Sequence, residues 1–313
     1  MERPFDLQGH RGARGLKPEN TFPAFEVALD LGVTTIETDV HLTRDGVPVL
    51  FHDAIVSPLL CERVPGSTAP WPTAHPAVSA LTLAQLRGYR AHSNPDPERF
   101  PHQDTSVTPA ARLFAGRHGL DPFVPPTLAD LFHFTEAYAG DLGEQAGKTP
   151  AQRARARRVC FDLDVKRLPF RPEVIGDDYD ASGPALLEHR VVQAVRAGGM
   201  VARTTVRSFD HRCVRALRQL EPALTAAVIV AEAAPVDPAA VARQAGAQLY
   251  CPRLDFLDPA QVRQLHAEGV RVVPWTVNDH HDWGCLLRWG VDGITTDYPD
   301  DLAEFLRARG VAY

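Results

Sequence analysis

The feature that most constrains the fold of this chain is a regular alternation of short apolar runs with helical patterns. Eight runs rich in β-branched residues predict buried strands, and the segments between them predict helices, several of which end in glycine. The predicted strands are residues 6–11, 34–40, 159–165, 202–208, 224–230, 248–251, 271–277 and 292–297. Eight strands separated by helices favour an α/β fold of the TIM, or (β/α)8, barrel type, with a doubly wound parallel sheet as the alternative.

A ninth apolar run, residues 47–51, departs from this alternation. Only the sequence LTRDG separates it from the second predicted strand, whereas a parallel crossover needs a dozen residues or more. The run therefore predicts an antiparallel hairpin that extends the second barrel strand. His52, which follows the run, is then held beyond that strand instead of within the barrel.

Residues 54–126 interrupt the barrel pattern with a proline-rich stretch that has few strand signals. Thr82 is the predicted N-cap of one helix within it, and the sequence PPTLADLFHF predicts a second helix start at its end. So long an irregular connection in a compact domain is usually functional or mobile. We interpret residues 1–313 as a single (β/α)8 domain and residues 54–126 as a lid or side segment inserted within it.

Composition argues against several other classes of protein. The chain of 313 residues has a formal net charge of −6, which disfavours a nucleic-acid-binding surface. No apolar run reaches the roughly 18 residues of a membrane span, so no stable membrane association is expected. The five cysteines share no close spacing and the N-terminus lacks a signal-peptide pattern, which predicts a reducing, cytoplasmic setting. The sequence carries no signal for an oligomeric state.

Two carboxylates on one predicted strand suggest a metal site. In the sequence IETDV, Glu37 and Asp39 are two residues apart, so their side chains project from the same face of the strand. Burying unpaired carboxylates is costly, and a hard cation such as Mg²⁺ or Ca²⁺, which takes oxygen ligands, accounts for the pair. The alternative is that both carboxylates form ion pairs with arginines of the barrel.

The third barrel strand repeats the pattern in the sequence FDLDVK. Asp162, Asp164 and Lys166 alternate with apolar residues and share one face. One of the two aspartates can complete the metal site, and the sequence leaves open which. Lys166 either neutralises a bound anion or forms a structural ion pair.

Two histidines are candidates for acid–base chemistry. His10 and Arg11 lie where the first strand meets its loop, and a guanidinium there suits bidentate binding of phosphate. His52, at the end of the hairpin, can face His10 across the mouth of the barrel. Two imidazoles that flank a phosphate supply a base and an acid near neutral pH.

Other polar and aromatic positions near strand ends carry two interpretations each. Glu19 and Asn20 precede a helix that Asn20 or Thr21 caps, so capping is the alternative to a functional role for this pair. Trp275 ends a predicted strand and is either a core residue or a flat apolar wall for a glycerol or alkyl group.

Together these segments resemble the glycerophosphodiester phosphodiesterase family, within the phosphatidylinositol-phospholipase-C-like barrel hydrolases. The matching segments are HRG at 10–12, PENT at 18–21, ETDVHLTRDGVPVLFHD at 37–53, DLDVK at 162–166, Ser208-Phe209, WTVN at 275–278 and GITTDYP at 293–299. The resemblance implies a divalent metal ion held by Glu37, Asp39 and Asp164. The family usually has glutamate where this chain has Asp164 and often asparagine where it has Asp162, so the shorter Asp164 would place the metal differently.

The resemblance also implies the roles of the remaining candidates. Arg11 and Lys166 would contact the phosphate of the substrate, and by analogy with the phospholipase C relatives His10 would be the base and His52 the acid. The implied reaction is metal-dependent hydrolysis of a glycerophosphodiester to glycerol 3-phosphate and an alcohol. The alternatives are a lipid-directed phospholipase of the same barrel type and a non-catalytic protein that binds a metal and a phosphodiester.

Overall fold

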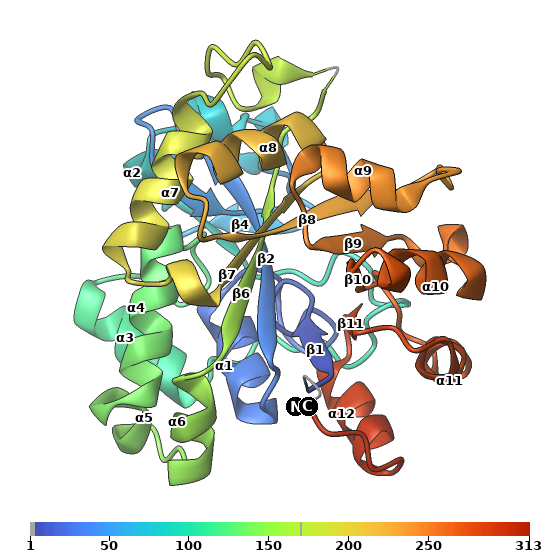
Figure 1. The fold of residues 1–313 in the computed structure, drawn as a ribbon. Helices are drawn as coiled ribbons and strands as arrows, with labels where there is room; N and C mark the ends of the chain where they lie inside the picture. Colours follow the sequence, from blue (N-terminus) through green and yellow to red (C-terminus); the bar gives the residue numbers. More distant parts are fainter. Residues whose placement is uncertain (1–3, 170) are drawn as a thin grey trace.

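The barrel strands follow the alternation predicted from the sequence. The computed structural model describes residues 4–169 and 171–313, and Figure 1 shows the parallel strands surrounded by helices. The strands are β1 Asp6–Gly9, β2 Thr35–Leu42, β6 Cys160–Val165, β7 Thr204–Ser208, β8 Thr225–Val230, β9 Leu249–Pro252, β10 Arg271–Val272 and β11 Gly293–Thr296. They are hydrogen-bonded in the order β10-β9-β8-β7-β6-β2-β1-β11. The N–H of Asp292 donates to the carbonyl of Val272 at 2.9 Å and links the two end strands. The chain therefore forms a nearly closed (β/α)8 barrel, as predicted, and not a doubly wound sheet.

One barrel strand is much shorter than its predicted run. β10 covers Arg271–Val272, whereas the run of apolar residues continues to residue 277. Pro274 has no backbone N–H to donate to a neighbouring strand, and Trp275 makes only an isolated bridge with Arg253. The apolar run indicates that these residues are buried, but Pro274 shortens the hydrogen-bonded part of the strand.

Capping residues set the bounds of the helices. α1 Phe22–Leu31 begins after Thr21, whose side chain accepts the N–H of Ala24, and ends at Gly32 with a φ of 79°. α4 Leu128–Ala139 begins after Thr127 with a capping box. The other helices of the barrel are α5 Asp141–Gln145, α6 Pro150–Ala156, α7 Leu186–Ala197, α8 His211–Leu220, α9 Pro238–Ala245, α10 Pro259–Ala267, α11 His280–Trp289 and α12 Pro299–Arg307. None of the helices in the described part of the chain is both long and apolar enough to cross a membrane.

The hairpin predicted after the second strand is present. β3 Pro48–Leu50 pairs antiparallel with the end of β2, and Leu50 lies opposite Val40. The connecting turn closes through Gly46, whose φ of 75° lies in the left-handed region that glycine adopts without strain. β3 joins only β2 and stays outside the ring of barrel strands, so the residues that follow it stand above the mouth of the barrel.

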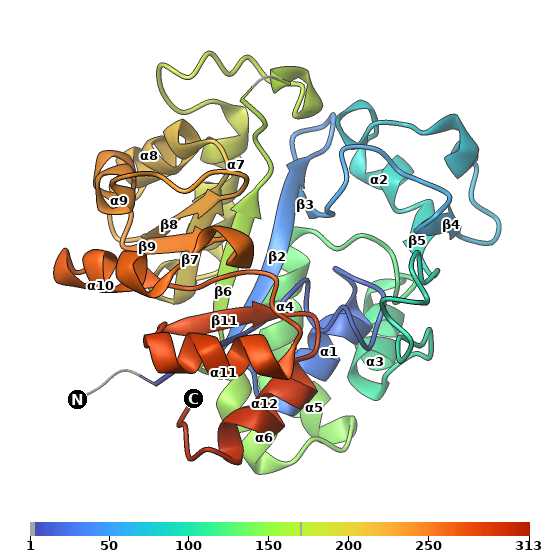
Figure 2. The ribbon, with the colours of Figure 1, turned by 90° about the vertical axis from the view of Figure 1, so that its right-hand side faces the viewer.

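The segment between β3 and α4 contains elements that the sequence analysis did not predict. β4 Cys61–Arg63 and β5 Tyr89–Ala91 form a small antiparallel sheet near α2 Leu83–Leu86, and Figure 2 shows these elements standing to one side of the barrel. Their apolar side chains form a separate small core that includes Val56, Leu86 and Tyr89. α3 Pro109–His118 instead joins the barrel core, where Phe114 packs against the Phe22 ring at a centroid distance of 5.1 Å.

Candidate active site

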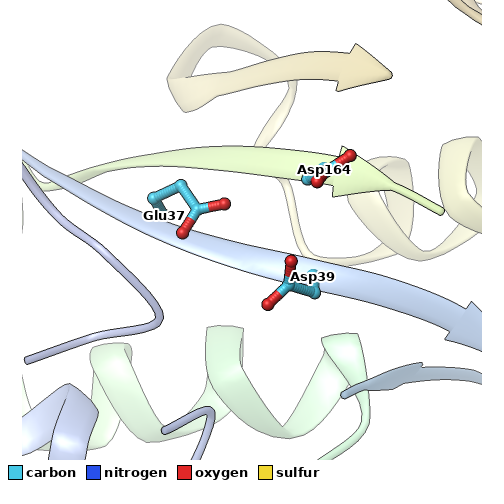
Figure 3. A group of neighbouring side chains, drawn as sticks. All are labelled: Glu37, Asp39 and Asp164. Carbon is cyan, nitrogen blue, oxygen red and sulfur yellow. The ribbon is translucent and has the colours of Figure 1, made fainter. Parts of the chain in front are cut away.

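Carboxylates from two adjacent strands meet at the carboxyl end of the barrel. β2 and β6 pair in register with Asp39 opposite Asp164, and parallel strands place such neighbours on the same face. Figure 3 shows Glu37 and Asp39 on β2 and Asp164 on β6, and one carboxylate oxygen from each lies within 4.8 Å of the others. Asp162 lies opposite Glu37, two residues deeper in the barrel, and its Oδ2 pairs with Arg207. The acidic cluster therefore consists of Glu37, Asp39 and Asp164.

Three cations lie among these carboxylates. The Nζ atom of Lys166 is 2.7 Å from Oδ1 of Asp39 and 2.6 Å from Oδ2 of Asp164. The Nε atom of Arg11 is 3.2 Å from Oδ2 of Asp39. The buried side chain of Arg207 on β7 contacts Glu37 at 2.7 Å. The ion pairs considered as an alternative are thus present, and they bring positive charge to the place where an anionic substrate would need it.

One feature of the acidic cluster suits a metal ion. Oδ1 of Asp164 is buried and has no hydrogen-bond partner among the described residues, although buried carboxylate oxygens are normally paired. Burial would raise the pKa of Asp39, but Lys166 and Arg11 outweigh it and hold that pKa well below its usual range. Burial raises the pKa of Glu37 to about 7, and a bound divalent cation would favour its ionised form. The donor set of carboxylate oxygens fits Mg²⁺ or Ca²⁺.

Asp297, which directly follows the last barrel strand, fixes the ring of His10. The ring donates its Nδ1–H to Oδ1 of Asp297 at 2.6 Å, because an ionised carboxylate can only accept. The other oxygen of Asp297 accepts from Asn278 at 2.8 Å and from Arg99 at 3.2 Å. Burial lowers the pKa of His10 to about 4 against the opposing effect of Asp297. His10 is therefore neutral at pH 7, with its Nε2 lone pair free and 3.9 Å from Oε2 of Glu37.

The loop after β1 is shaped so that its backbone reaches the acidic cluster. The backbone N–H of Arg11 donates to Oε2 of Glu37 at 2.9 Å. Gly12 has a φ of 90°, and a Cβ atom there would lie 2.8 Å from the carbonyl carbon of Ala24. Only glycine fits this position without displacing α1, so the close approach of the loop to the helix has a steric basis.

Glu19 and Asn20 serve the site and not the helix cap. Thr21 caps α1, whereas Glu19 contacts Nη1 of Arg11 at 2.8 Å. The side-chain amide of Asn20 donates to Oδ2 of Asp39 at 2.8 Å. These two residues therefore hold the guanidinium and one carboxylate of the cluster in place. Of the two interpretations that the sequence left open for this pair, these contacts favour the functional one, whereas no role was predicted for Arg207 or Asp297.

His52 lies at a more exposed rim of the same pocket. It follows β3, and its ring donates Nδ1–H to Oδ1 of Asp53 at 2.7 Å. The side chains of His52 and Asp53 are 34% and 49% exposed, in contrast to the buried pair of His10 and Asp297. The backbone carbonyl of His52 accepts from Nε2 of His41 at 3.0 Å. Both predicted histidines thus carry an Nδ1 partner that leaves Nε2 free.

One pocket, with a cavity volume of about 140 Å³, brings the predicted residues together. Its lining consists of His10, Arg11, Glu37, Asp39, His52, Asp164, Lys166, Arg207, Phe209, Ile229 and Trp275. The apolar side of the pocket is formed by Trp275, which packs edge-on against Phe209 at a centroid distance of 5.6 Å. Trp275 also donates its Nε1–H to the carbonyl of Cys251 at 2.9 Å. The tryptophan is therefore anchored to β9 and at the same time presents an apolar wall.

The arrangement can bind a phosphodiester and transfer protons on both sides of it. Arg11, Lys166 and Arg207 bring positive charge to the pocket that both imidazoles line. Charge fixed in advance around a reacting phosphate is the usual means by which enzymes stabilise its transition state.

Comparison with known proteins places the whole chain in one group. The model of the glycerophosphoryl diester phosphodiesterase family matches residues 10–301. The glycerophosphodiester phosphodiesterase of Caldanaerobacter subterraneus is 25% identical over 304 residues, which cover 96% of this chain and 97% of that protein. A probable glycerophosphodiester phosphodiesterase of Mycobacterium tuberculosis is 29% identical over 315 residues, with 98% and 95% covered.

Solved structures share the same barrel. A glycerophosphoryl diester phosphodiesterase described for Silicibacter pomeroyi superposes with a TM-score of 0.76 at 28% identity, covering 98% of this chain and 94% of that chain. A phosphodiesterase of Oleispira antarctica, solved in complex with the product sn-glycerol-3-phosphate, gives a TM-score of 0.66 at 20% identity, with 96% of each chain covered. At that identity the second structure is a likeness of fold.

Proposed function

The chain belongs to the glycerophosphoryl diester phosphodiesterase family and is a phosphoric diester hydrolase, and we propose that it hydrolyses glycerophosphodiesters to glycerol 3-phosphate and an alcohol with two histidines as base and acid. The observation that carries the proposal is that His10 and His52 line one pocket together with carboxylates and cations. The glycerol 3-phosphate bound to the Oleispira relative supports the same product for this chain.

The surroundings of the two histidines support different roles. His10 is buried and neutral, and its hydrogen bond to Asp297 leaves Nε2 as the only atom that can accept a proton from a nucleophilic hydroxyl or water. His52 is partly exposed to solvent. Its Nε2 would donate a proton to the oxygen of the leaving group, which then departs as the alcohol, and water would return a proton to the ring.

The acidic cluster is proposed to hold a divalent cation, Mg²⁺ or Ca²⁺. Glu37, Asp39 and Asp164 would be its protein ligands, with the unpartnered Oδ1 of Asp164 as an available donor atom. When bound, the ion would add positive charge beside the phosphate oxygens. Arg11 and Lys166 would share the same role from the protein side, since both cations line the pocket.

The apolar wall is proposed to bind the part of the substrate that carries no charge. Trp275 and Phe209 form this wall in the pocket that the acidic cluster also lines, and Trp275 is fixed by its bond to Cys251. A glycerol or alkyl group packed there would orient the diester for attack. A lipid-directed phospholipase remains the alternative, in which the same wall would contact an acyl-bearing glycerol.

A screen of metals against substrates tests the proposal. Purified protein with Mg²⁺, Ca²⁺ or Mn²⁺ should release choline or glycerol from water-soluble glycerophosphodiesters, and a chelator should abolish the release. His10→Ala and His52→Ala should each lower kcat by about 10²–10⁴-fold, the usual range for removing a general acid or base. Cleavage of phospholipid vesicles without cleavage of soluble diesters would favour the phospholipase. Full activity in chelator would contradict the metal site.

A further inference from the structure

Two hydrogen bonds tie the peptide around His52 to β2. The N–H of Phe51 donates to the carbonyl of Asp39 at 3.1 Å, which continues the ladder between the two hairpin strands. Beyond that point the tie comes from a side chain: Nε2 of His41 lies 3.0 Å from the carbonyl oxygen of His52. A carbonyl can only accept, so the His41 ring donates. The peptide that carries His52 is thereby attached to the strand that carries Glu37 and Asp39.

Burying the His41 side chain at its position has a free-energy cost. It is 2% exposed and faces the barrel interior on the same side of β2 as the two carboxylates. Its Nδ1 is buried and has no hydrogen-bond partner among the described residues. An apolar side chain of similar volume would fill the space without a buried unpaired nitrogen, and would lose only the bond to the His52 carbonyl. Packing alone therefore does not account for a histidine here, whereas the bond to the His52 carbonyl does.

The other contact of His52 cannot fix the ring relative to the barrel. Within the described residues, its side-chain hydrogen bond goes to Asp53, which is the next residue and moves with the same peptide. Asp53 is also half exposed. A general acid must come within hydrogen-bond reach of the leaving oxygen, and a displacement of about 1 Å costs on the order of 10²-fold in rate. Some element outside the hairpin end has to set the position of His52.

We infer that His41 is a positioning residue for His52, holding the peptide from which the second imidazole projects into the pocket. This inference rests on the proposed role of His52 as the acid that protonates the leaving alcohol. His41 itself does not line the pocket, so it acts through His52 and not on the substrate. We therefore expect that replacing His41 lowers the rate most for substrates whose leaving group needs a proton.

The test compares two diesters of glycerol 3-phosphate that differ only in the leaving group. Choline leaves as an alkoxide that needs a proton, whereas p-nitrophenolate leaves without one. Steady-state rates with Mg²⁺ are measured for wild type, His41→Leu, His41→Gln and His52→Ala. The exposed His189 on α7 supplies the matched control, His189→Leu. The temperature of unfolding is measured for each variant.

We expect His41→Leu to lower kcat on the choline diester by about 10- to 100-fold with little change in KM, and kcat on the nitrophenyl diester by less than about 3-fold. His52→Ala should show the same contrast with a larger loss. His41→Gln, which keeps a donor near the place of Nε2, should regain most of the lost rate. His41→Leu should unfold close to the wild-type temperature, because removing the unpaired nitrogen offsets the loss of the bond to the His52 carbonyl.

Two results would overturn the inference, and they are distinct from failure of the proposed function. Equal losses of His41→Leu on both diesters would assign His41 to the general integrity of the site. Unchanged activity of His41→Leu, together with a leaving-group contrast in His52→Ala, would show that the hairpin needs no such tie. If His52→Ala itself shows no contrast between the two diesters, the proposed acid role fails and the inference fails with it.

Discussion

The two rims of the pocket hold the same chemical unit in opposite surroundings. On one rim, His10 donates Nδ1–H to Asp297, and both residues are buried by strands of the barrel. On the other rim, His52 makes the same bond to Asp53, and both side chains face solvent from the end of a hairpin. A buried neutral ring can only accept a proton, whereas an exposed ring can be reprotonated by water. The two histidines have the same kind of carboxylate partner and differ in burial, so burial is what would separate the proposed roles of base and acid.

The largest effect is expected on the buried rim. Asp297→Asn should lower kcat by about 10³-fold, because an amide no longer enforces the tautomer with Nδ1–H, and a comparable change at a buried histidine partner costs on the order of 10⁴ in a serine protease. Steady-state kinetics on a soluble glycerophosphodiester would measure it, with the unfolding temperature as a check on folding. A loss of less than 10-fold would mean that burial alone orients the ring of His10.

A second effect concerns stability and pH. Burial lowers the pKa of both His10 and His41 to about 4, whereas an unfolded imidazole has a pKa of about 6.5. The unfolded chain binds more protons between these values, so stability that is present above about pH 6.5 is lost as the pH falls toward 4. We expect each histidine to contribute a fall of about 2 kcal/mol in the free energy of unfolding between pH 7 and pH 5.

Denaturant titrations of metal-free protein at pH 7 and pH 5 would measure this fall. In His41→Leu the difference between the two pH values should shrink by about 2 kcal/mol, because the substituted chain has one proton fewer to bind on unfolding. If the free energy of unfolding falls equally between pH 7 and pH 5 in the variant and in wild type, burial does not lower the pKa of His41.

A smaller effect is expected on the exposed rim. Asp53→Asn should lower kcat on an alkyl diester by about 10-fold or less, since Asp53 is half exposed and water can replace a solvent-facing partner. The hydrogen bond from His52 lowers the pKa of Asp53, so the pair is formed with an ionised carboxylate. Parallel kinetics of Asp53→Asn and Asp297→Asn would measure the contrast between the rims. Equal losses would remove burial as the distinguishing factor.

The barrel could be predicted from the sequence because its signals are local. Apolar runs of β-branched residues and helix caps such as Thr21 and Thr82 act within a few positions, and the structure has strands and caps there. The short hairpin also followed from a local fact, the length of its turn. The β4–β5 sheet was missed because its strands have three residues each, too short for a clear alternation.

The site residues also divide into those with a local sequence signal and those without one. Glu37 and Asp39 could be paired from their spacing on one strand, and the structure groups them with Asp164. Arg207 was missed because it joins the site through contacts with Glu37 and Asp162, both far from it in the sequence. Asp297 was noticed at a strand end, but its bond to His10 joins opposite ends of the chain. No local pattern encodes a contact that exists only once the barrel closes.

The smallest expected effect tests whether the segment of residues 54–126 contributes to the catalytic rate. Arg99 of this segment lies 3.2 Å from Oδ2 of Asp297, and its side chain is 48% exposed. Half-exposed ion pairs contribute at most about 1 kcal/mol, and Asn278 donates to the same oxygen at 2.8 Å. Arg99→Gln should therefore lower kcat by no more than about 3- to 5-fold, with Arg112→Gln on the exposed face of α3 as the matched control. A loss as large as that of Asp297→Asn would show that the segment, and not the barrel, holds the pair of His10 and Asp297 in place, and the contrast between the buried rim and the exposed one would have to be redrawn around Arg99.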